Sequence, residues 1–149
     1  MFKKLLVATD GSDLGNKALD TAIELARLSG GAITVLTATD PVATGIGSGG
    51  FGTIDAGAIV TRLEESYAAQ AKTLLDEARA KVAAAGIGIE TLHAARQSGA
   101  DAIIAAVTER GFDVVVMGSH GRRGIGRLLL GSQAAEVLSR SSVPVLIVK

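Results

Sequence analysis

Short apolar runs alternate along the chain with longer segments in which apolar residues recur every three or four positions. Uninterrupted apolar runs are typical of strands buried on both faces of a parallel sheet, and the longer periodic segments are typical of amphipathic helices. The pattern predicts strands at residues 5–9, 33–39, 87–95, 114–117 and 143–148. It predicts helices at residues 14–29, 58–85, 98–110 and 132–140. This alternation indicates parallel strands joined by right-handed crossovers.

Glycine and serine residues mark the ends of the predicted helices. Gly30 and Gly86 each follow a helical segment and would end it. Ser98, with Asp101 three positions later, resembles a capping box, and Ser132 is the candidate N-cap of the last helix. In the long second helix, the residues predicted to face the core are Leu63, Tyr67, Ala71, Leu74, Leu75, Ala78 and Val82.

Residues 41–57 interrupt the alternation. This segment holds six glycines and has no periodicity, so we expect a long flexible loop of the kind that forms a lid or stays disordered. The chain of 149 residues has the length of one ordinary domain with its own core. We therefore expect a single domain over residues 1–149.

The composition of the chain excludes several classes of protein. Lys plus Arg and Asp plus Glu number 15 each, so the net charge is zero, and no basic stripe favours nucleic acid. The absence of cysteine excludes disulfides, thiol catalysis and Cys-ligated metal sites. No apolar run reaches the length of about 18 residues that a membrane span needs, and the N-terminal run is too short for a signal peptide. We therefore expect a cytoplasmic protein that binds neither nucleic acid nor membrane.

The segment 113–132 carries the residues best suited to a ligand. Its apolar run is followed by Gly118 and Gly121, and Gly131 and Ser132 then open the last helix. Glycine lets the main chain approach a ligand without a Cβ in the way. A helix start presents unpaired N–H groups and the positive end of a dipole, which suit a phosphate. One glycine alone would indicate only a turn, but the set predicts a phosphate cradle.

The spacing Gly118-x-x-Gly121, nine residues, Gly131-Ser132 resembles the nucleotide-binding signature of the universal stress protein family. The opening segment 3–26 and the closing segment 141–149 also resemble that family, so the resemblance covers almost the whole chain. It implies an α/β fold, a three-layer sandwich with a five-stranded parallel sheet of order 3-2-1-4-5 and a Rossmann-like nucleotide site. Ligands in such sheets bind at the carboxyl ends of the strands, where the strand order reverses.

The resemblance also implies which residues contact the nucleotide. The glycine amides and the Ser132 hydroxyl would hold the phosphates, with help from the Gln133 amide. Asp10 would lie beside the ribose or the metal–phosphate end, and the main chain of Ala38 would read the adenine edge. The residues implied to bind are Ala8, Thr9, Asp10, Ala38, Met117, Gly118, His120, Gly121, Arg122, Gly131, Ser132 and Gln133.

The implied ligand is ATP, with Mg²⁺ or Mn²⁺ held through its phosphates and Asp10 as the one candidate protein ligand. Arg122, Arg123 and Arg127 would either close over the phosphates or form a solvated basic loop. The family commonly has a histidine at the position of His120, but no Ser–His–Asp set can be assigned, so we expect no catalytic residue. His93 has no metal-ligand partner in the sequence and is interpreted as structural.

Two further glycine patterns resemble the motifs of other nucleotide-binding folds but lack a feature that those motifs need. Residues 45–50 match G-x-G-x-x-G, but no helix follows directly, so the dinucleotide-binding context is missing. Residues 126–132 resemble a P-loop but lack its lysine. Neither pattern therefore supports a second class of nucleotide site.

The last apolar run, Val143–Val148, contains Pro144, which favours an edge strand because proline cannot donate to a sheet ladder. In the family this strand pairs with its copy across a two-fold axis, so the resemblance implies a homodimer. A monomer with a short terminal edge is the alternative.

The function implied by the resemblance is that of an ATP-binding stress-response sensor or regulator with at most slow ATP hydrolysis. A nucleotide-free dimeric interaction module and a weak ATPase or phosphoryl-transfer enzyme remain alternatives. The glycine signature argues against the first, and the missing lysine and general base argue against the second.

Overall fold

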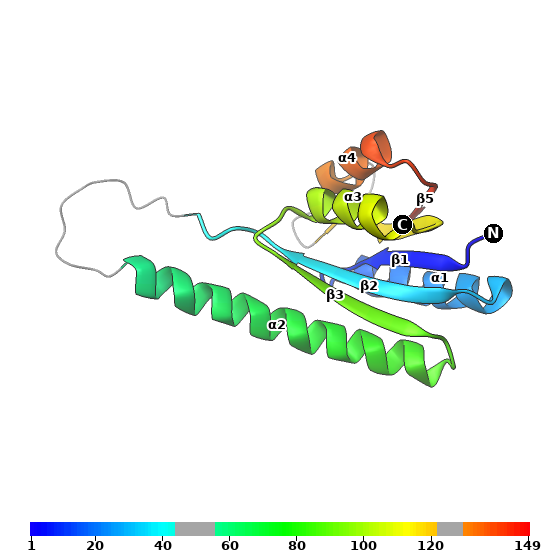
Figure 1. Cartoon of the computed structure of the whole chain (residues 1–149), viewed down its shortest axis with the longest axis horizontal. Coiled ribbons are helices and arrows are strands. Elements are labelled where there is room, and N and C mark those ends of the chain that lie inside the picture. The colour runs from blue at the N-terminus through cyan, green and yellow to red at the C-terminus, as the bar shows by residue number, and fades with distance from the viewer. Residues whose placement is uncertain (44–55, 122–129) are drawn as a thin grey trace.

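The computed structural model describes residues 1–43, 56–121 and 130–149. Strands and helices alternate along these parts of the chain, as the hydrophobic pattern predicts (Figure 1). The elements are β1 (Lys4–Ala8), α1 (Asp13–Ser29), β2 (Ala32–Thr39), α2 (Ala56–Ala84), β3 (Ile89–Ala95), α3 (Gly99–Arg110), β4 (Val114–Gly118), α4 (Ser132–Arg140) and β5 (Val145–Val148).

The five strands form one parallel sheet in the order β3-β2-β1-β4-β5, which confirms the expected fold. The central strand β1 pairs with β2 on one side and β4 on the other, so that Leu5 lies between Ile33 and Val114. Figure 1 shows α1 and α2 on one face of the sheet and α3 and α4 on the other, which makes three layers. The strand order therefore reverses between β1 and β4, the position at which such sheets bind ligands.

Alternate residues of β1 supply two separate cores. Leu5 and Val7 pack with α1 and α2, whereas Leu6 packs with α3 and α4, and all three side chains are fully buried. Successive side chains of a strand point to opposite faces, so a strand covered on both faces must be apolar throughout. This requirement explains the uninterrupted runs LLV and VVVM in the sequence.

The helix α2 is longer than the sheet that it covers. Its 29 residues span about 43 Å, whereas the eight residues of β2 span about 26 Å. Ala71, Leu75, Ala78 and Val82 are buried as predicted. The prediction that Leu63 and Tyr67 face the core is wrong, because the amino-terminal half of α2 extends past the ends of the strands, and these side chains are 38% and 36% exposed (Figure 1).

The element boundaries agree with the predictions to within two residues, and the starts of α2 and β5 are among those that differ by two. Helix α2 begins at Ala56, so the last two residues of the loop expected at 41–57 are helical, and residues 44–55 lie outside the described parts. Strand β5 begins after Pro144, whose carbonyl accepts a hydrogen bond from the Val115 N–H at 2.9 Å.

The predicted residues mark the end of α1 (Gly30), the end of α2 (Gly86) and the start of α3 (Ser98). The Ser12 hydroxyl caps α1 by accepting from the Gly15 N–H at 3.1 Å, and Gly30 ends that helix in the left-handed conformation. Gly86 has a positive φ of 73° just beyond α2. The Ser98 hydroxyl caps α3 by accepting the Asp101 N–H at 3.1 Å. The same hydroxyl donates to the Asp101 carboxylate at 2.9 Å, so the two side chains of the predicted capping box contact each other directly. Among the described helices, none is long and apolar enough to span a membrane.

Candidate functional site

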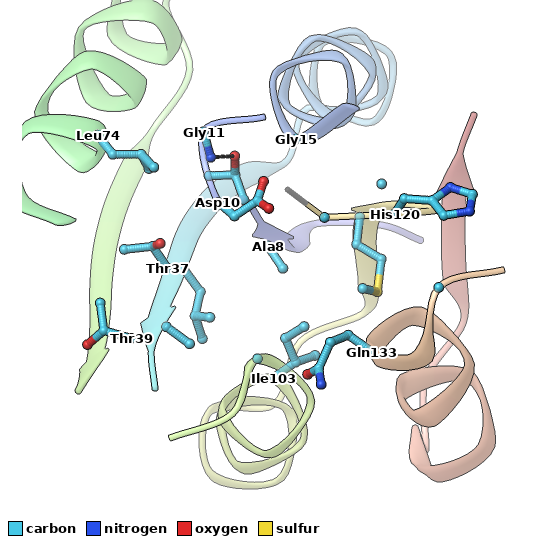
Figure 2. Close-up of a pocket in the computed structure, with 18 of the residues that line it drawn as sticks. Ala8, Asp10, Gly11, Gly15, Thr37, Thr39, Leu74, Ile103, His120 and Gln133 are labelled. Atoms are coloured by element: carbon cyan, nitrogen blue, oxygen red, sulfur yellow. Dashed lines mark hydrogen bonds between the residues drawn. The ribbon is translucent and has the colours of Figure 1, made fainter. Parts of the chain in front are cut away.

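A cleft of about 1100 Å³ opens at the carboxyl ends of β1, β2 and β4 (Figure 2). Eleven of the predicted binding residues line it: Ala8, Thr9, Asp10, Ala38, Met117, Gly118, His120, Gly121, Gly131, Ser132 and Gln133. The twelfth, Arg122, lies outside the described residues, as do Arg123 and Arg127. The fold therefore gathers residues that are more than 120 positions apart in the sequence around one hollow.

Asp10 is held in the turn between β1 and α1. Gly11, with a φ of 77°, donates its N–H to the Thr9 hydroxyl at 3.2 Å, and the Ser12 N–H donates to Asp10 Oδ1 at 3.0 Å. Figure 2 shows the Asp10 side chain pointing from this turn toward the segment that carries His120. Ser12 is the residue that caps α1, and the Asp10 carboxylate lines the cleft.

Glycines around Asp10 permit close contacts within the protein. A Cβ at Gly121 would lie 2.8 Å from Asp10 Oδ2, and one at Gly15 would lie 2.5 Å from the Thr9 hydroxyl oxygen. At Gly118 a Cβ would lie 3.0 Å from the Leu14 Cβ. These residues are therefore glycines because neighbouring protein atoms occupy the space, in addition to any ligand. Gly15 was missed by sequence reasoning, since a glycine inside a helix has no distinctive pattern.

The Ser119 main chain links the two glycine segments. Its carbonyl accepts the Gly131 N–H at 2.8 Å, and its own N–H donates to the Val148 carbonyl at 2.8 Å. A Cβ at Gly131 would lie only 2.9 Å from the Ser119 carbonyl oxygen, so glycine is needed for this approach. The turn after β4 and the start of α4 are thereby held beside each other, and both line the cleft.

The amino-terminal end of α4 differs from the prediction in one respect. Gly131, not Ser132, occupies the N-cap position, and no side chain caps the helix. Ser132 is instead the first helical residue, because Gly131 takes the extended conformation that precedes the helix. A helix start without a side-chain cap directs N–H groups and the positive end of the dipole toward the cleft, which suits an anion.

Gln133 has two separate roles in this geometry. Its side-chain oxygen accepts the Ala100 N–H at 2.7 Å and so satisfies a donor in the first turn of α3. This bond does not involve the main-chain N–H of Gln133, which is the group that the resemblance implies for the phosphate contact. The side-chain contact with α3 was not predictable, because nothing in the sequence indicates which residues face each other across α3 and α4.

The two described histidines each contact a hydroxyl group. The Ser119 hydroxyl and His120 Nδ1 are 2.9 Å apart, while His120 Nε2 is buried with no partner among the described residues. Figure 2 shows the His120 ring pointing away from Asp10. His93 Nε2 lies 2.9 Å from the Thr39 hydroxyl across two paired strands, in line with its structural interpretation.

The cleft has a further wall that the sequence did not assign to the site. Residues of α2 at helical spacing line it: Tyr67, Gln70, Ala71, Thr73, Leu74 and Glu77. Tyr67, Ala71 and Leu74 were predicted to face the core. The spacing predicted the correct face of α2 but not the length of the sheet beneath it.

The carboxylates that line the cleft are Asp10, Asp40 and Glu77. Among residues 1–43, 56–121 and 130–149, no group of three or more His, Cys, Asp and Glu side chains is placed to hold a metal ion. Mg²⁺ is usually held by one or two carboxylates together with substrate phosphates. The side chains present therefore fit a metal bound mainly through a ligand, with Asp10 as the carboxylate nearest the glycine segments.

The parallel sheet, the cleft at its switch point and the uncapped helix start define a Rossmann-like α/β protein with a site suited to a phosphorylated ligand. The model of the universal stress protein family matches residues 1–149, and the chain belongs to this family.

A curated relative agrees with this assignment, and a solved structure shares the fold. The universal stress protein YxiE of Bacillus subtilis is 32% identical, with all of both chains covered. UspA from Lactobacillus plantarum shares the fold, with a TM-score of 0.85, 21% identity and coverage of 99% of this chain and 98% of the other.

Two similar structures contain nucleotides. A universal stress protein in complex with cAMP has a TM-score of 0.70 and 29% identity and covers 99% of this chain and 96% of its own. The universal stress protein from Archaeoglobus fulgidus in complex with dAMP has a TM-score of 0.66, 26% identity and full coverage of both chains.

Proposed function

We propose that this protein binds ATP in the cleft and acts as a cytoplasmic stress-response sensor or regulator. The observation that carries the proposal is the placement of Gly121, Gly131 and the uncapped start of α4 around one cleft with Asp10. Similar proteins bind cAMP and dAMP, which supports an adenine nucleotide as the ligand.

The cleft offers different surroundings to the parts of a nucleotide. The main chain at Gly118 and Gly121 and the first turn of α4 suit the phosphates, and the Asp10 carboxylate suits ribose hydroxyls or a phosphate-bound metal. Ala8 and Ala38 supply apolar or main-chain surface for the base, and Met117 lies against the ribose. Mg²⁺ or Mn²⁺ would neutralise the charge of the triphosphate when bound.

Affinity must come from the whole cleft. A micromolar site requires about 8 kcal/mol, whereas one contact at a helix end contributes about 0.3–1 kcal/mol. Several main-chain amides and burial of the base must therefore act together. This requirement fits a ligand that extends across the cleft.

We propose that ATP turnover is slow or absent. His120 contacts Ser119 and has no carboxylate to orient it among the described residues, and no P-loop lysine is present. Positioning of the attacking water and stabilisation of charge are the main contributions of enzymes that hydrolyse ATP. A site without these groups suits a regulatory switch better than a metabolic step.

We also propose a homodimer through the C-terminal segment Val143–Val148. Strand β5 lies at the edge of the sheet and pairs only with β4 among the described strands. The side chain of Leu146 on this strand is 39% exposed. An apolar edge strand is an aggregation hazard unless it is covered, and a second copy would cover it.

The proposal can be tested with protein purified without added nucleotide. The protein is denatured, and the released material is analysed for adenine nucleotides by chromatography; the native protein is then incubated with ATP and Mg²⁺. We expect ATP to be bound or released, with little product formed. Rapid product formation would indicate an enzyme, and a stable dimer without ATP binding would indicate an interaction module.

A further inference from the structure

The wall formed by α2 faces the phosphate-binding side of the cleft. Figure 2 shows Leu74 of α2 on one side and Gln133 and His120 on the other, with Ala8 and Asp10 between them. Tyr67, Ala71 and Leu74 follow one another at helical spacing along this wall. A nucleotide that is held by its phosphates at α4 and extends across the cleft would bring its base close to α2.

Tyr67 retains free surface at this wall. Ala71 is 4% exposed and Leu74 packs against the core, whereas Tyr67 is 36% exposed although it lines the cleft. An aromatic ring has a flat apolar face that stacks on other planar rings. The chain contains one tyrosine and no tryptophan, so Tyr67 is the sole residue of either type.

An ion pair fixes α2 close to Tyr67. Arg96, in the turn after β3, donates from Nε and Nη2 to the two carboxylate oxygens of Glu64 at 2.8 and 2.7 Å. This paired contact lowers the pKa of the Glu64 carboxyl group, with the hydrogen bond from Arg96 as the largest cause. The next residue, Gln97, donates its N–H to the Thr39 carbonyl at the end of β2. The helix turn that precedes Tyr67 is thus tied to the strand ends beneath the cleft.

We propose that the Tyr67 ring stacks on the base of the bound nucleotide and so favours ligands with a planar heteroaromatic group. This inference rests on the proposed nucleotide-binding function and adds a recognition element on α2. Aromatic side chains stack on any base, so Tyr67 contributes affinity for bases in general. Selection of adenine remains with groups that contact its edge.

The test combines tyrosine fluorescence with calorimetry. ATP should change the emission of the wild-type protein, because its single tyrosine contacts the base. Tyr67→Ala should weaken ATP binding by about fivefold or more, the lower end of the effect of removing a base-stacking aromatic residue. Tyr67→Phe should retain the affinity because it keeps the ring. Leu63→Ala is the matched control, since Leu63 lies one turn earlier on α2, is similarly exposed and is not among the residues lining the cleft.

Inorganic tripolyphosphate separates the base from the phosphates. We expect Tyr67→Ala to bind tripolyphosphate as the wild type does, because this probe has no base. Wild-type ATP affinity in Tyr67→Ala, or calorimetric ATP binding without a change in tyrosine emission, would overturn the stacking contact alone. A wild-type protein that binds no adenine nucleotide would contradict the proposed function itself.

Discussion

At the scale of single residues, the glycines of the site make room for neighbouring protein atoms and also expose main-chain N–H groups to the cleft. Gly121 borders the Asp10 carboxylate, and Gly131 borders the Ser119 carbonyl, so each is required by a protein contact. The same contacts bring main-chain N–H groups to the surface of the cleft. A side chain at either position would change the shape of the cleft even without a ligand.

The substitution Gly121→Val tests this residue. Its Cβ would come within 2.8 Å of Asp10 Oδ2, which must displace the carboxylate or the turn. We expect ATP affinity to fall by about tenfold or more, which corresponds to about 1.4 kcal/mol. The fold and the dimer should persist, because the turn lies at the rim of the sheet. Isothermal calorimetry measures the affinity, and thermal unfolding checks the fold.

Gly88→Ala is the matched control for this experiment. A Cβ at Gly88 would make only an ordinary contact of 3.4 Å with the Ala32 Cβ, at the end of the sheet away from the cleft. It should leave ATP affinity unchanged. Unaltered affinity in Gly121→Val as well would reject the glycine cradle.

At the scale of elements, the hydrophobic pattern predicted every strand and helix that the structure describes, because burial on one or two faces fixes the period of apolar residues. It could not show that α2 extends beyond the sheet, since this depends on the relative lengths of two elements far apart in the sequence. It also assigned the N-cap of α4 to Ser132, whereas Gly131 occupies that position beside the Ser119 carbonyl. Contacts of this kind depend on the tertiary fold.

The Asp113 carboxylate, which lies just before β4, binds the main chain at the start of β1, and this contact leads to a prediction about the pH dependence of stability. Asp113 accepts hydrogen bonds from the N–H groups of Lys3 at 2.7 Å and Lys4 at 2.9 Å. These two hydrogen bonds lower the pKa of the Asp113 carboxyl group below its usual value near 4, and the bond from the Lys4 N–H has the larger effect. A lowered folded-state pKa means that the stabilisation is present above the unfolded-state pKa and is lost as pH falls through the folded-state pKa.

Urea unfolding of the wild type and of Asp113→Ala tests this effect. At neutral pH, we expect the variant to unfold at a lower urea concentration. As the pH falls below about 4, the difference should shrink, because the wild type loses the same interaction. A constant difference in midpoint across this range would mean that the Asp113 charge does not contribute.

At the scale of the whole molecule, the edge strand β5 connects the proposed dimer surface with the site. The Val148 carbonyl of β5 accepts the Ser119 N–H, and the Ser119 carbonyl accepts the Gly131 N–H. Two hydrogen bonds therefore separate the edge of the sheet from the start of α4. The glycine signature and the C-terminal strand were predicted from the sequence, but this connection required the fold.

A charged residue on β5 should separate the subunits. In Leu146→Lys, the new ammonium group would lie in the proposed interface, where burial without a partner is unfavourable. We expect a dimer for the wild type and a monomer for the variant in analytical ultracentrifugation. Leu28→Lys, at a position of α1 that is 88% exposed, should remain dimeric. A dimer that persists in Leu146→Lys would place the interface elsewhere.

We propose above all that the main chain of the two glycine segments and the start of α4 hold the phosphates of a nucleotide. Titration of ¹⁵N-labelled protein with ATP and Mg²⁺, followed through the backbone amide signals, tests it most directly. We predict that the largest shifts fall on Gly118, Gly121, Ser132 and Gln133, and that tripolyphosphate shifts the same amides. Shifts confined to other parts of the chain, with these four amides unchanged, would contradict the account.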